Sequence, residues 1–299
     1  MFTRFTWAQW GAIAITAGAL ALAGCSSSSS TPAAKASGSP SASPSAASLT
    51  ATQAITLAGQ NAGKVTSFAA TVNVHTTGEA TTTTISGTLQ ERTEPSPLVV
   101  ANFGSVTAQG QALPGGIEEI INSNAIYLKL AQVAKETGKP WVEIPASELS
   151  EISGGNLGQL LQNDNSDPLV QTQMVASSTN VKQAGTTTLN GVPVTEYTGT
   201  YPISAGLAKL PASERTRVSQ QLQALGVTTE HFTIWLDSKQ HVRKVVTSAQ
   251  GSKVQETSTI QVTSINGPVS AAIPPASQTA TVPASELGGS GANGSPAAS

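Results

Sequence analysis

Two periods of apolar residues alternate along the middle of the chain. A helical period comes first, because apolar residues recur at steps of three and four directly after Thr50. They are Ala51, Ile55, Ala58, Ala62 and Val65. Threonine is a residue type that caps helices, so the stretch predicts an amphipathic helix that begins after Thr50. From residue 68 onward the period changes to two, which is typical of half-buried β-strands.

About ten strands follow, and short turns join most of them. Residues that favour turns stand between apolar segments at Ser123-Asn124, Asn190-Gly191 and Ser238-Lys239. Because strands linked by hairpins pair with antiparallel neighbours, these turns predict an antiparallel sheet.

Helical patterns return between the strands. Residues 157–161 carry a short leucine stripe, and Asp167-Pro168 has the residue types of a helix start. A further helix is predicted over residues 212–225, ending at Gly226. The fold class we expect is therefore α+β: a curved, unclosed antiparallel β half-barrel of about ten strands, with helices covering its concave face.

One face of the predicted strands is apolar almost throughout. In residues 231–236, Phe232, Ile234 and Leu236 share one face while polar residues and Trp235 share the other. The full apolar set is Phe68, Val72, Val74, Ile85, Leu89, Ile126, Leu128, Val142, Ile144, Phe232, Ile234 and Leu236. Two interpretations of this set stay open: an ordinary core packed against helices, or the lining of an apolar ligand cavity.

The start of the chain has the form of an export signal. From residue 11 to residue 24 every residue except Thr16 is apolar or glycine, a length that suits a secretory signal and is short for a bilayer span of about 20 residues. The run closes with Leu22-Ala23-Gly24-Cys25, which resembles the bacterial lipobox. The resemblance implies that the Cys25 sulfur receives a diacylglyceryl group and that cleavage occurs before Cys25. Two acyl chains suffice for stable anchoring, so we expect the protein on the extracytoplasmic face of the cell membrane.

Composition divides the chain into four parts. Residues 1–24 are the predicted signal peptide, and residues 25–48 are a lipidated cysteine followed by a Ser/Ala/Pro-rich tether. Residues 49–276 form the predicted folded domain, and residues 277–299 a second low-complexity tail. Both terminal segments are too poor in apolar residues to offset the entropy of ordering, so we expect them to be disordered.

Charge and motifs exclude several function classes. The chain has 15 basic and 17 acidic side chains without a basic patch, which argues against nucleic acid as a partner. It carries no Gly-x-Ser-x-Gly and no His-Glu-x-x-His motif, so we expect neither an enzyme nor a metal site, and no cofactor. His231 and His241 would form at most a weak pair across a hairpin. Cys25 is the only cysteine, so no disulfide is expected.

The predicted domain resembles the actinobacterial LppX/LprG-type lipoproteins (LppX/LprAFG), which have a LolA/LolB-like fold. The matching stretches occur in the expected order and include "AIYLKL" with "GKPWVEI", "LNGVPVTEYTGTY", "FTIWLDSKQHVRKV" and "INGPVSAAIPPAS". The resemblance implies an unclosed barrel with an apolar cavity under its helices. It also implies lipid or lipoglycan acyl chains as ligands, an envelope transporter as a possible partner, and a monomer.

Two functions are compatible with these features. The first is a membrane-anchored exported lipoprotein that binds lipid or another hydrophobic ligand and carries it across the cell envelope. The second is a cell-surface interaction, sensor or scaffold lipoprotein whose core is filled. An apolar pocket and an apolar core have the same sequence pattern, so the strand sequences do not separate the two.

Replacing Cys25 tests the anchor. Because a serine cannot form the thioether, Cys25→Ser is expected to move the protein from the membrane to the soluble fraction or to leave the signal uncleaved. Metabolic labelling with a fatty acid measures this, with the unchanged chain as the control. Label retained by Cys25→Ser would contradict the prediction.

Overall fold

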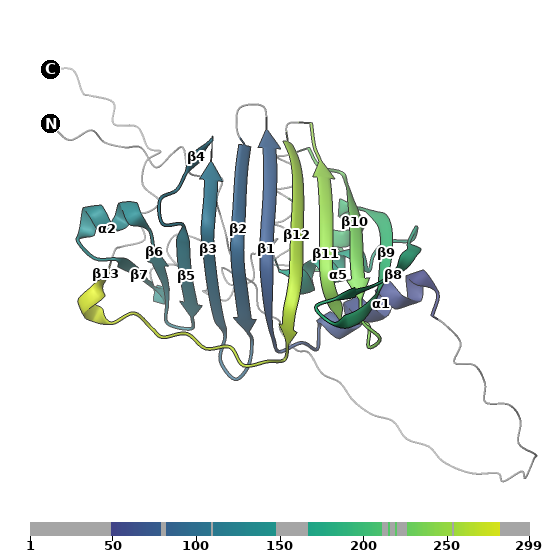
Figure 1. Ribbon diagram of the computed structural model, residues 1–299, viewed down its shortest axis with the longest axis horizontal. Coiled ribbons are helices and arrows are strands. Elements are labelled where there is room, and N and C mark those ends of the chain that lie inside the picture. The colour runs from purple at the N-terminus through teal and green to yellow at the C-terminus, as the bar shows by residue number, and fades with distance from the viewer. Residues whose placement is uncertain are drawn as a thin grey trace, which may run out of the picture.

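One large sheet dominates the computed structural model, which describes residues 49–78, 82–108, 110–147, 167–210, 215, 219, 226–252 and 254–281 (Figure 1). Within these residues the sheet has thirteen strands, all antiparallel to their neighbours except β13, which pairs parallel with β7. The predicted fold class, an unclosed, mostly antiparallel α+β architecture, is confirmed. The short strands β4 and β13 account for most of the excess over the roughly ten strands predicted.

The strands follow the predicted alternation closely. In the first half of the chain they are β1 (Ser67–Gly78), β2 (Thr82–Arg92), β3 (Leu98–Ala108), β4 (Gln111–Ala112), β5 (Ile117–Asn122), β6 (Ala125–Lys129) and β7 (Trp141–Pro145). In the second half they are β8 (Lys182–Leu189), β9 (Val192–Pro202), β10 (Thr229–Leu236), β11 (Val242–Gln250), β12 (Val254–Ile265) and β13 (Thr279–Thr281). The order across the sheet is β13-β7-β6-β5-β3-β2-β1-β12-β11-β10-β9-β8, with β4 beside β3.

The centre of the sheet is a pairing between the two ends of the folded chain. Strand β1 pairs with β12 from Phe68 opposite Ile265 to Gly78 opposite Val254. Every other strand attaches to this pair on one side or the other, so the two halves of the sequence share one sheet.

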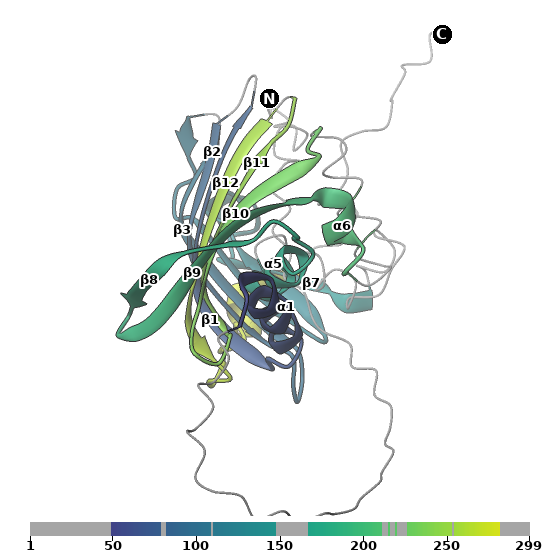
Figure 2. The ribbon, with the colours of Figure 1, turned by 90° about the vertical axis from the view of Figure 1, so that its right-hand side faces the viewer.

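Three helices lie inside the curve of the sheet (Figure 2). They are α1 (Ala51–Ala62), α5 (Pro168–Val175) and α6 (Ile203–Leu207), and α5 packs against β11 and β9. Both predicted helix starts are confirmed: Thr50 forms a capping box with Gln53, and the Asp167 side chain accepts from the Leu169 backbone N–H at 2.6 Å. The short helix α2 (Ala131–Thr137), which the sequence pattern did not predict, lies next to β7.

Apolar side chains line up across the inner face, which is the face that α1, α5 and α6 cover. One row runs through five adjacent strands, with each member directly opposite the next. It consists of Val72, Ile260, Val245, Ile234 and Tyr197, which are all at most 5% exposed. This row joins the helices in one apolar cluster, so the inner face is the core side of the sheet.

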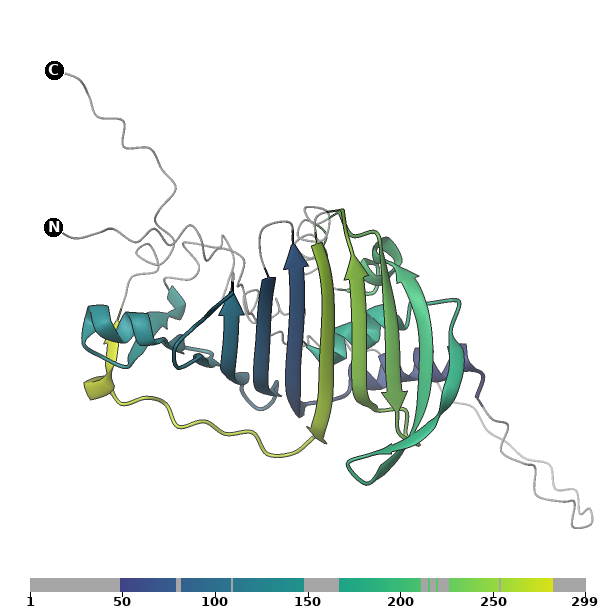
Figure 3. The same ribbon diagram turned by 45° about the horizontal axis from the view of Figure 1, so that its top comes forward.

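The outer face carries a second, smaller apolar cluster. The C-terminal strap, residues 266–281, covers this cluster. It runs past the ends of the strands from β12 to β13 (Figures 1 and 3) and contains the 3₁₀ helix Ala276–Gln278. Val269 of the strap packs against Leu98, Ile120, Ala125 and Tyr127. An Arg92 guanidinium N–H donates to the Val269 carbonyl at 2.8 Å.

The ordered chain continues past the predicted domain end at residue 276. Strand β13 places residues 279–281 in the sheet, although they belong to the segment 277–299 that composition predicts as disordered. A three-residue edge strand needs only backbone hydrogen bonds, so composition gives no sign of it.

Several predictions concern residues outside the described ones. They include the signal peptide, Cys25, the tether, the leucine stripe of residues 157–161 and most of the helix predicted over residues 212–225. Among the described residues, no helix is long and apolar enough to span a membrane.

A glycine in β2 gives a test of the sheet. Gly87 lies at a bulge between β2 and β3, where an added Cβ would be 2.0 Å from the Asn102 backbone oxygen. Gly87→Ala is therefore expected to lower the free energy of unfolding by about 2–3 kcal/mol, the size of an overpacking defect, in urea titrations.

The matched control is Gly185 of β8, which also follows a bulge but has nothing within 4 Å of an added Cβ. Gly185→Ala is expected to be neutral or to stabilise by up to about 1 kcal/mol. Equal effects of the two changes would contradict the close approach at Gly87.

Candidate functional site

All twelve residues of the predicted apolar set come together on the inner face. Nine are buried, and Val74, Ile85 and Leu128 are partly buried against the same cluster. The strand parity read from the sequence therefore places each of them correctly. A filled core and a ligand pocket share this arrangement, so the role of the set as ligand contacts stays a prediction.

Carboxylates interrupt this apolar face. Glu91 lies opposite Phe68 and is 2% exposed, and Glu119 lies between Ala101 and Leu128 and is 6% exposed. Glutamate is seldom buried to this degree. Alternation in residues 117–121 places Glu119 on the same face as Ile117 and Ile121 and so indicates that it faces inward. The sequence analysis predicted neither Glu119 nor Glu91 to face inward.

A further polar cluster occupies the inner face near one end of β10. Glu230 lies between Tyr201 and Ala249, and Glu256 lies opposite Ala249 on the next strand. The Tyr201 hydroxyl donates to the Glu230 carboxylate, and the Thr76 hydroxyl donates to Glu256 at 3.1 Å. At this level of the sheet, two hydrogen-bonded carboxylates therefore take the place of apolar side chains.

Burial decides how these acids titrate. Removal from water raises the pKa of Glu230, and the nearby Glu256 carboxylate raises it further, while hydrogen bonds from Tyr201 and Thr247 act in the opposite direction. Burial also raises the pKa of Glu256 and holds the pKa of Tyr201 well above its usual value. A carboxyl with a raised pKa exchanges its proton closer to neutral pH than an exposed one.

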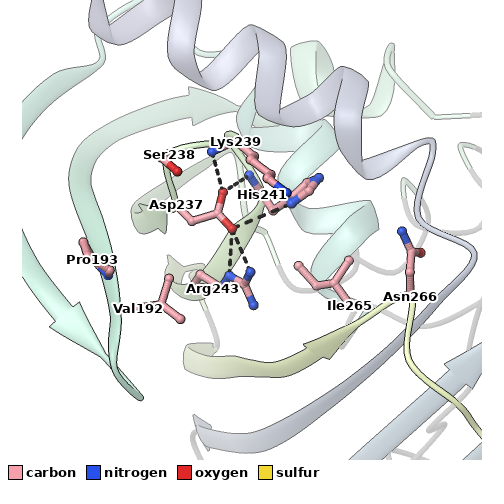
Figure 4. A pocket seen from close by; sticks show the side chains of 9 residues that line it. All are labelled: Val192, Pro193, Asp237, Ser238, Lys239, His241, Arg243, Ile265 and Asn266. Atoms are coloured by element: carbon pink, nitrogen blue, oxygen red, sulfur yellow. Dashed lines mark hydrogen bonds and ion pairs between the residues drawn. The ribbon is translucent and has the colours of Figure 1, made fainter.

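A separate pocket of about 410 Å³ lies at the opposite end of β10 (Figure 4). We call it the turn pocket, because most of its lining comes from the β10–β11 turn and from Arg243, the second residue of β11. Its walls are Val192, Pro193, Asp237, Ser238, Lys239, His241, Arg243, Ile265 and Asn266. The sequence analysis interpreted Ser238-Lys239 only as a turn and did not predict a pocket.

Asp237 is the structural centre of the turn pocket. Its buried carboxylate accepts from the backbone N–H groups of Lys239 and His241 at 2.9 and 3.0 Å. The same carboxylate accepts two hydrogen bonds from the Arg243 guanidinium at 3.0 and 2.8 Å. Burial alone would raise the pKa of Asp237, but these hydrogen bonds and the Arg243 charge outweigh it and lower the pKa.

A bulge in β11 supplies the arginine. Leu236 pairs with Val242 and Trp235 pairs with Lys244, so Arg243 is the extra residue of β11. The bulge keeps Val242 and Val245 on the inner face although two residues separate them, and it turns Arg243 toward Asp237.

The outer face has a shallow depression of a different character. It measures about 640 Å³ and spans β1, β2, β3 and β12. Its lining is mainly hydroxyl and amide side chains: Thr71, Asn73, Ser86, Thr88, Asn102, Thr259 and Gln261. The polar half of the predicted strand alternation therefore faces outward here.

In the described part of the chain, no group of three His, Cys, Asp or Glu side chains lies close enough to hold an ion together. His231 and His241, considered as a weak pair, lie at opposite ends of β10 and do not meet. The His75 ring is hydrogen-bonded through Nδ1 to the Thr84 hydroxyl at 3.1 Å and through Nε2 to the Thr77 hydroxyl at 3.3 Å.

Solved structures of lipoproteins are among the chain's structural neighbours, as the sequence predicted. LppX of Mycobacterium tuberculosis is 20% identical over 73% of this chain and 96% of its own, with a TM-score of 0.42. LprF of Mycobacterium bovis is 13% identical over 74% of this chain and 94% of its own, with a TM-score of 0.46. A LolA-superfamily protein of Nitrosomonas europaea is 9% identical over 73% and 93%, with a TM-score of 0.25. Because these TM-scores lie below 0.5, the likeness says nothing about what this chain binds.

Sequence comparison adds one curated relative. It is an uncharacterized 31.2 kDa protein of Streptomyces griseus, encoded between rplA and rplJ, and it is 33% identical over 112 residues. The matched region covers 36% of this chain and 36% of the relative. No protein-family model matches the chain.

Replacing Glu230 tests the titration of the inner face. Because the folded-state pKa of Glu230 is raised, its contribution to stability is complete below the unfolded pKa and is lost as pH rises through the folded pKa. Glu230→Gln removes this loss, so its stability relative to the unchanged protein is expected to increase from pH 5 to pH 8. Urea unfolding at several pH values measures the difference.

Tyr201→Phe serves as the control of opposite sign. It removes a hydrogen bond that lowers the pKa of Glu230, so it should make the loss of stability with rising pH larger. The same pH dependence in Glu230→Gln as in the unchanged protein would contradict the assignment.

Proposed function

We propose that this protein is a membrane-anchored, exported lipoprotein that binds lipid or another hydrophobic ligand on the inner face of its sheet and carries it across the cell envelope. The acyl chains of the ligand would pack against the twelve residues of the apolar set. The protein would act without catalysis, on the extracytoplasmic side of the membrane, anchored through diacylglyceryl-Cys25.

The observation that carries this proposal is the composition of the inner face. It is a continuous apolar surface from β7 to β9 in the order of the sheet, and a small number of buried carboxylates and hydroxyls stand within it. Thr247 and Ser258, for example, lie opposite each other between Val74 and Phe232 and are 3% and 4% exposed. Ligand sites typically combine apolar walls with a few polar groups that fix orientation, whereas a core that only packs holds such groups at a cost unless they are hydrogen-bonded.

Energetics support an acyl chain as the ligand. Moving apolar surface out of water contributes roughly 25 cal/mol per Å², so an acyl chain needs no charged partner to bind. Glu230 and Glu256 would then contact the polar end of a ligand, because both sit at the end of the apolar rows.

The second candidate, a surface interaction, sensor or scaffold lipoprotein without a ligand cavity, is favoured by one contact. Helices α1 and α5 approach so closely that a Cβ on Gly59 would lie 2.6 Å from the Ala176 Cβ. Such tight packing is typical of a filled core, and it holds for the part of the inner face that these two helices cover.

A bulky side chain on the inner face tests the carrier. Val72→Trp is expected to remove a bound lipid that native mass spectrometry detects in the protein with Cys25→Ser, purified gently from its native host. The indole ring would occupy space that the acyl chain uses. Thr71→Trp is the matched control, since Thr71 is the exposed neighbour on the outer face and should leave the lipid in place.

Circular dichroism of both variants separates loss of ligand from loss of fold. If the protein without an inner-face substitution carries no lipid and takes up no fluorescent fatty acid, the carrier is overturned. The surface interaction, sensor or scaffold lipoprotein is then favoured.

A further inference from the structure

We propose that the turn pocket binds a phosphate group, either free or as part of a lipid headgroup. The inference rests on the Asp237 turn and its cations, and it holds whether or not the inner face carries a ligand.

The charges of the turn pocket favour an anion. Lys239 and Arg243 each carry a positive charge, and Asp237 carries the one negative charge in the lining. Asp237 is already neutralised by the Arg243 guanidinium and by two backbone N–H groups. The lining therefore has a net charge of +1 from its Lys, Arg and Asp side chains.

Hydrogen-bond donors remain for a ligand in this arrangement. The pairing with Asp237 uses two of the five N–H groups that a guanidinium offers, those on Nε and one Nη. Lys239 is exposed, and its ammonium brings three donors to the mouth of the turn pocket. The planar guanidinium group of arginine and the ammonium group of lysine are the usual partners of phosphate oxygens in proteins.

The Arg243 guanidinium and the backbone of the turn are held in place before any ligand arrives. The Asn61 amide at the end of α1 donates to the Lys239 carbonyl at 2.9 Å, so the turn is fixed to a helix. On the far wall, the side-chain amide oxygen of Asn266 accepts from the Thr66 backbone N–H at 2.9 Å. A site that needs little ordering on binding retains more of its interaction energy as affinity.

The other walls suit a phosphate ester better than inorganic phosphate alone. Val192 and Pro193 on one side of Arg243, and Ile265 on the other, give the turn pocket apolar walls (Figure 4). Its volume of about 410 Å³ falls in the range of pockets for small organic ligands, roughly 300–1,000 Å³. Both sources of phosphate nevertheless share the chemistry of the cationic wall, and the experiment distinguishes them.

Isothermal titration calorimetry of the whole chain, purified in a non-ionic detergent, tests the site with two probes. One is sodium phosphate and the other is dihexanoyl phosphatidic acid, with dihexanoylglycerol as the phosphate-free control. Saturable binding of sodium phosphate identifies free phosphate as a ligand, and binding of the phosphatidic acid alone identifies a lipid headgroup. Binding of neither probe, or equal binding of dihexanoylglycerol and the phosphatidic acid without any binding of sodium phosphate, would overturn the proposal.

Lys239→Ala locates the binding. Lys239 is exposed, so its removal should leave the fold intact and weaken phosphate binding about two- to fivefold, the size of one exposed charge contact. Lys182→Ala on β8 removes an equally exposed lysine outside the turn pocket and should have no effect. Equal weakening by both changes would place the binding elsewhere and contradict the assignment.

Arg243→Gln should abolish binding, but it also leaves the buried Asp237 carboxylate without its guanidinium. Its unfolding is therefore checked by circular dichroism. If this variant does not fold, the comparison of Lys239→Ala with Lys182→Ala decides the question by itself.

Discussion

The pairing of β1 with β12 is the contact on which the rest of the structure depends. It joins residues that are nearly two hundred positions apart, such as Phe68 and Ile265, and it forms the middle of the sheet. Without it the chain would have two smaller sheets with two additional exposed edges, formed by β1 and β12. The apolar inner face would then be divided between the two sheets. Such non-local pairing costs much chain entropy, so it must be repaid by the apolar rows that it completes. The row of Val72, Ile260 and Val245 crosses this pairing directly.

The two ends of β10 show how this sheet manages charge in different ways. At one end Glu230 is half-buried on the inner face with a phenol and a second carboxylate, and desolvation raises its pKa. At the other end Asp237 is buried, but four hydrogen bonds, two of them from the Arg243 guanidinium, and the charge of that guanidinium lower its pKa. Asp237 has backbone donors and a charged guanidinium, whereas Glu230 has only uncharged hydroxyl donors, which do not outweigh its desolvation. One end therefore favours a proton, and the other holds a fixed ion pair with positive charge to spare.

The proposed carrier and the proposed phosphate site use separate surfaces of the same molecule. The inner face offers apolar area and a few acids, and the turn pocket offers cations at the edge of the sheet. The turn joins them mechanically, because Asn61 ties it to α1, which covers the inner face. A ligand with acyl chains and a phosphate would find complementary chemistry on each surface.

The sequence by itself determined the local structure and the face of each strand. Alternation placed Phe232, Ile234 and Leu236 on the core side, and residue types at Thr50 and Asp167 set two helix starts, since these signals act within a few residues. Composition and the lipobox likewise gave expectations for the termini without any fold. Only the tertiary structure decided which strands are neighbours, that β13 joins the sheet, and that a bulge and a turn combine into a cationic pocket. These features depend on contacts between distant residues, and neither alternation nor composition carries information about such contacts. The space left between helices and sheet is of the same kind, because it is set by how far the packed layers stand apart.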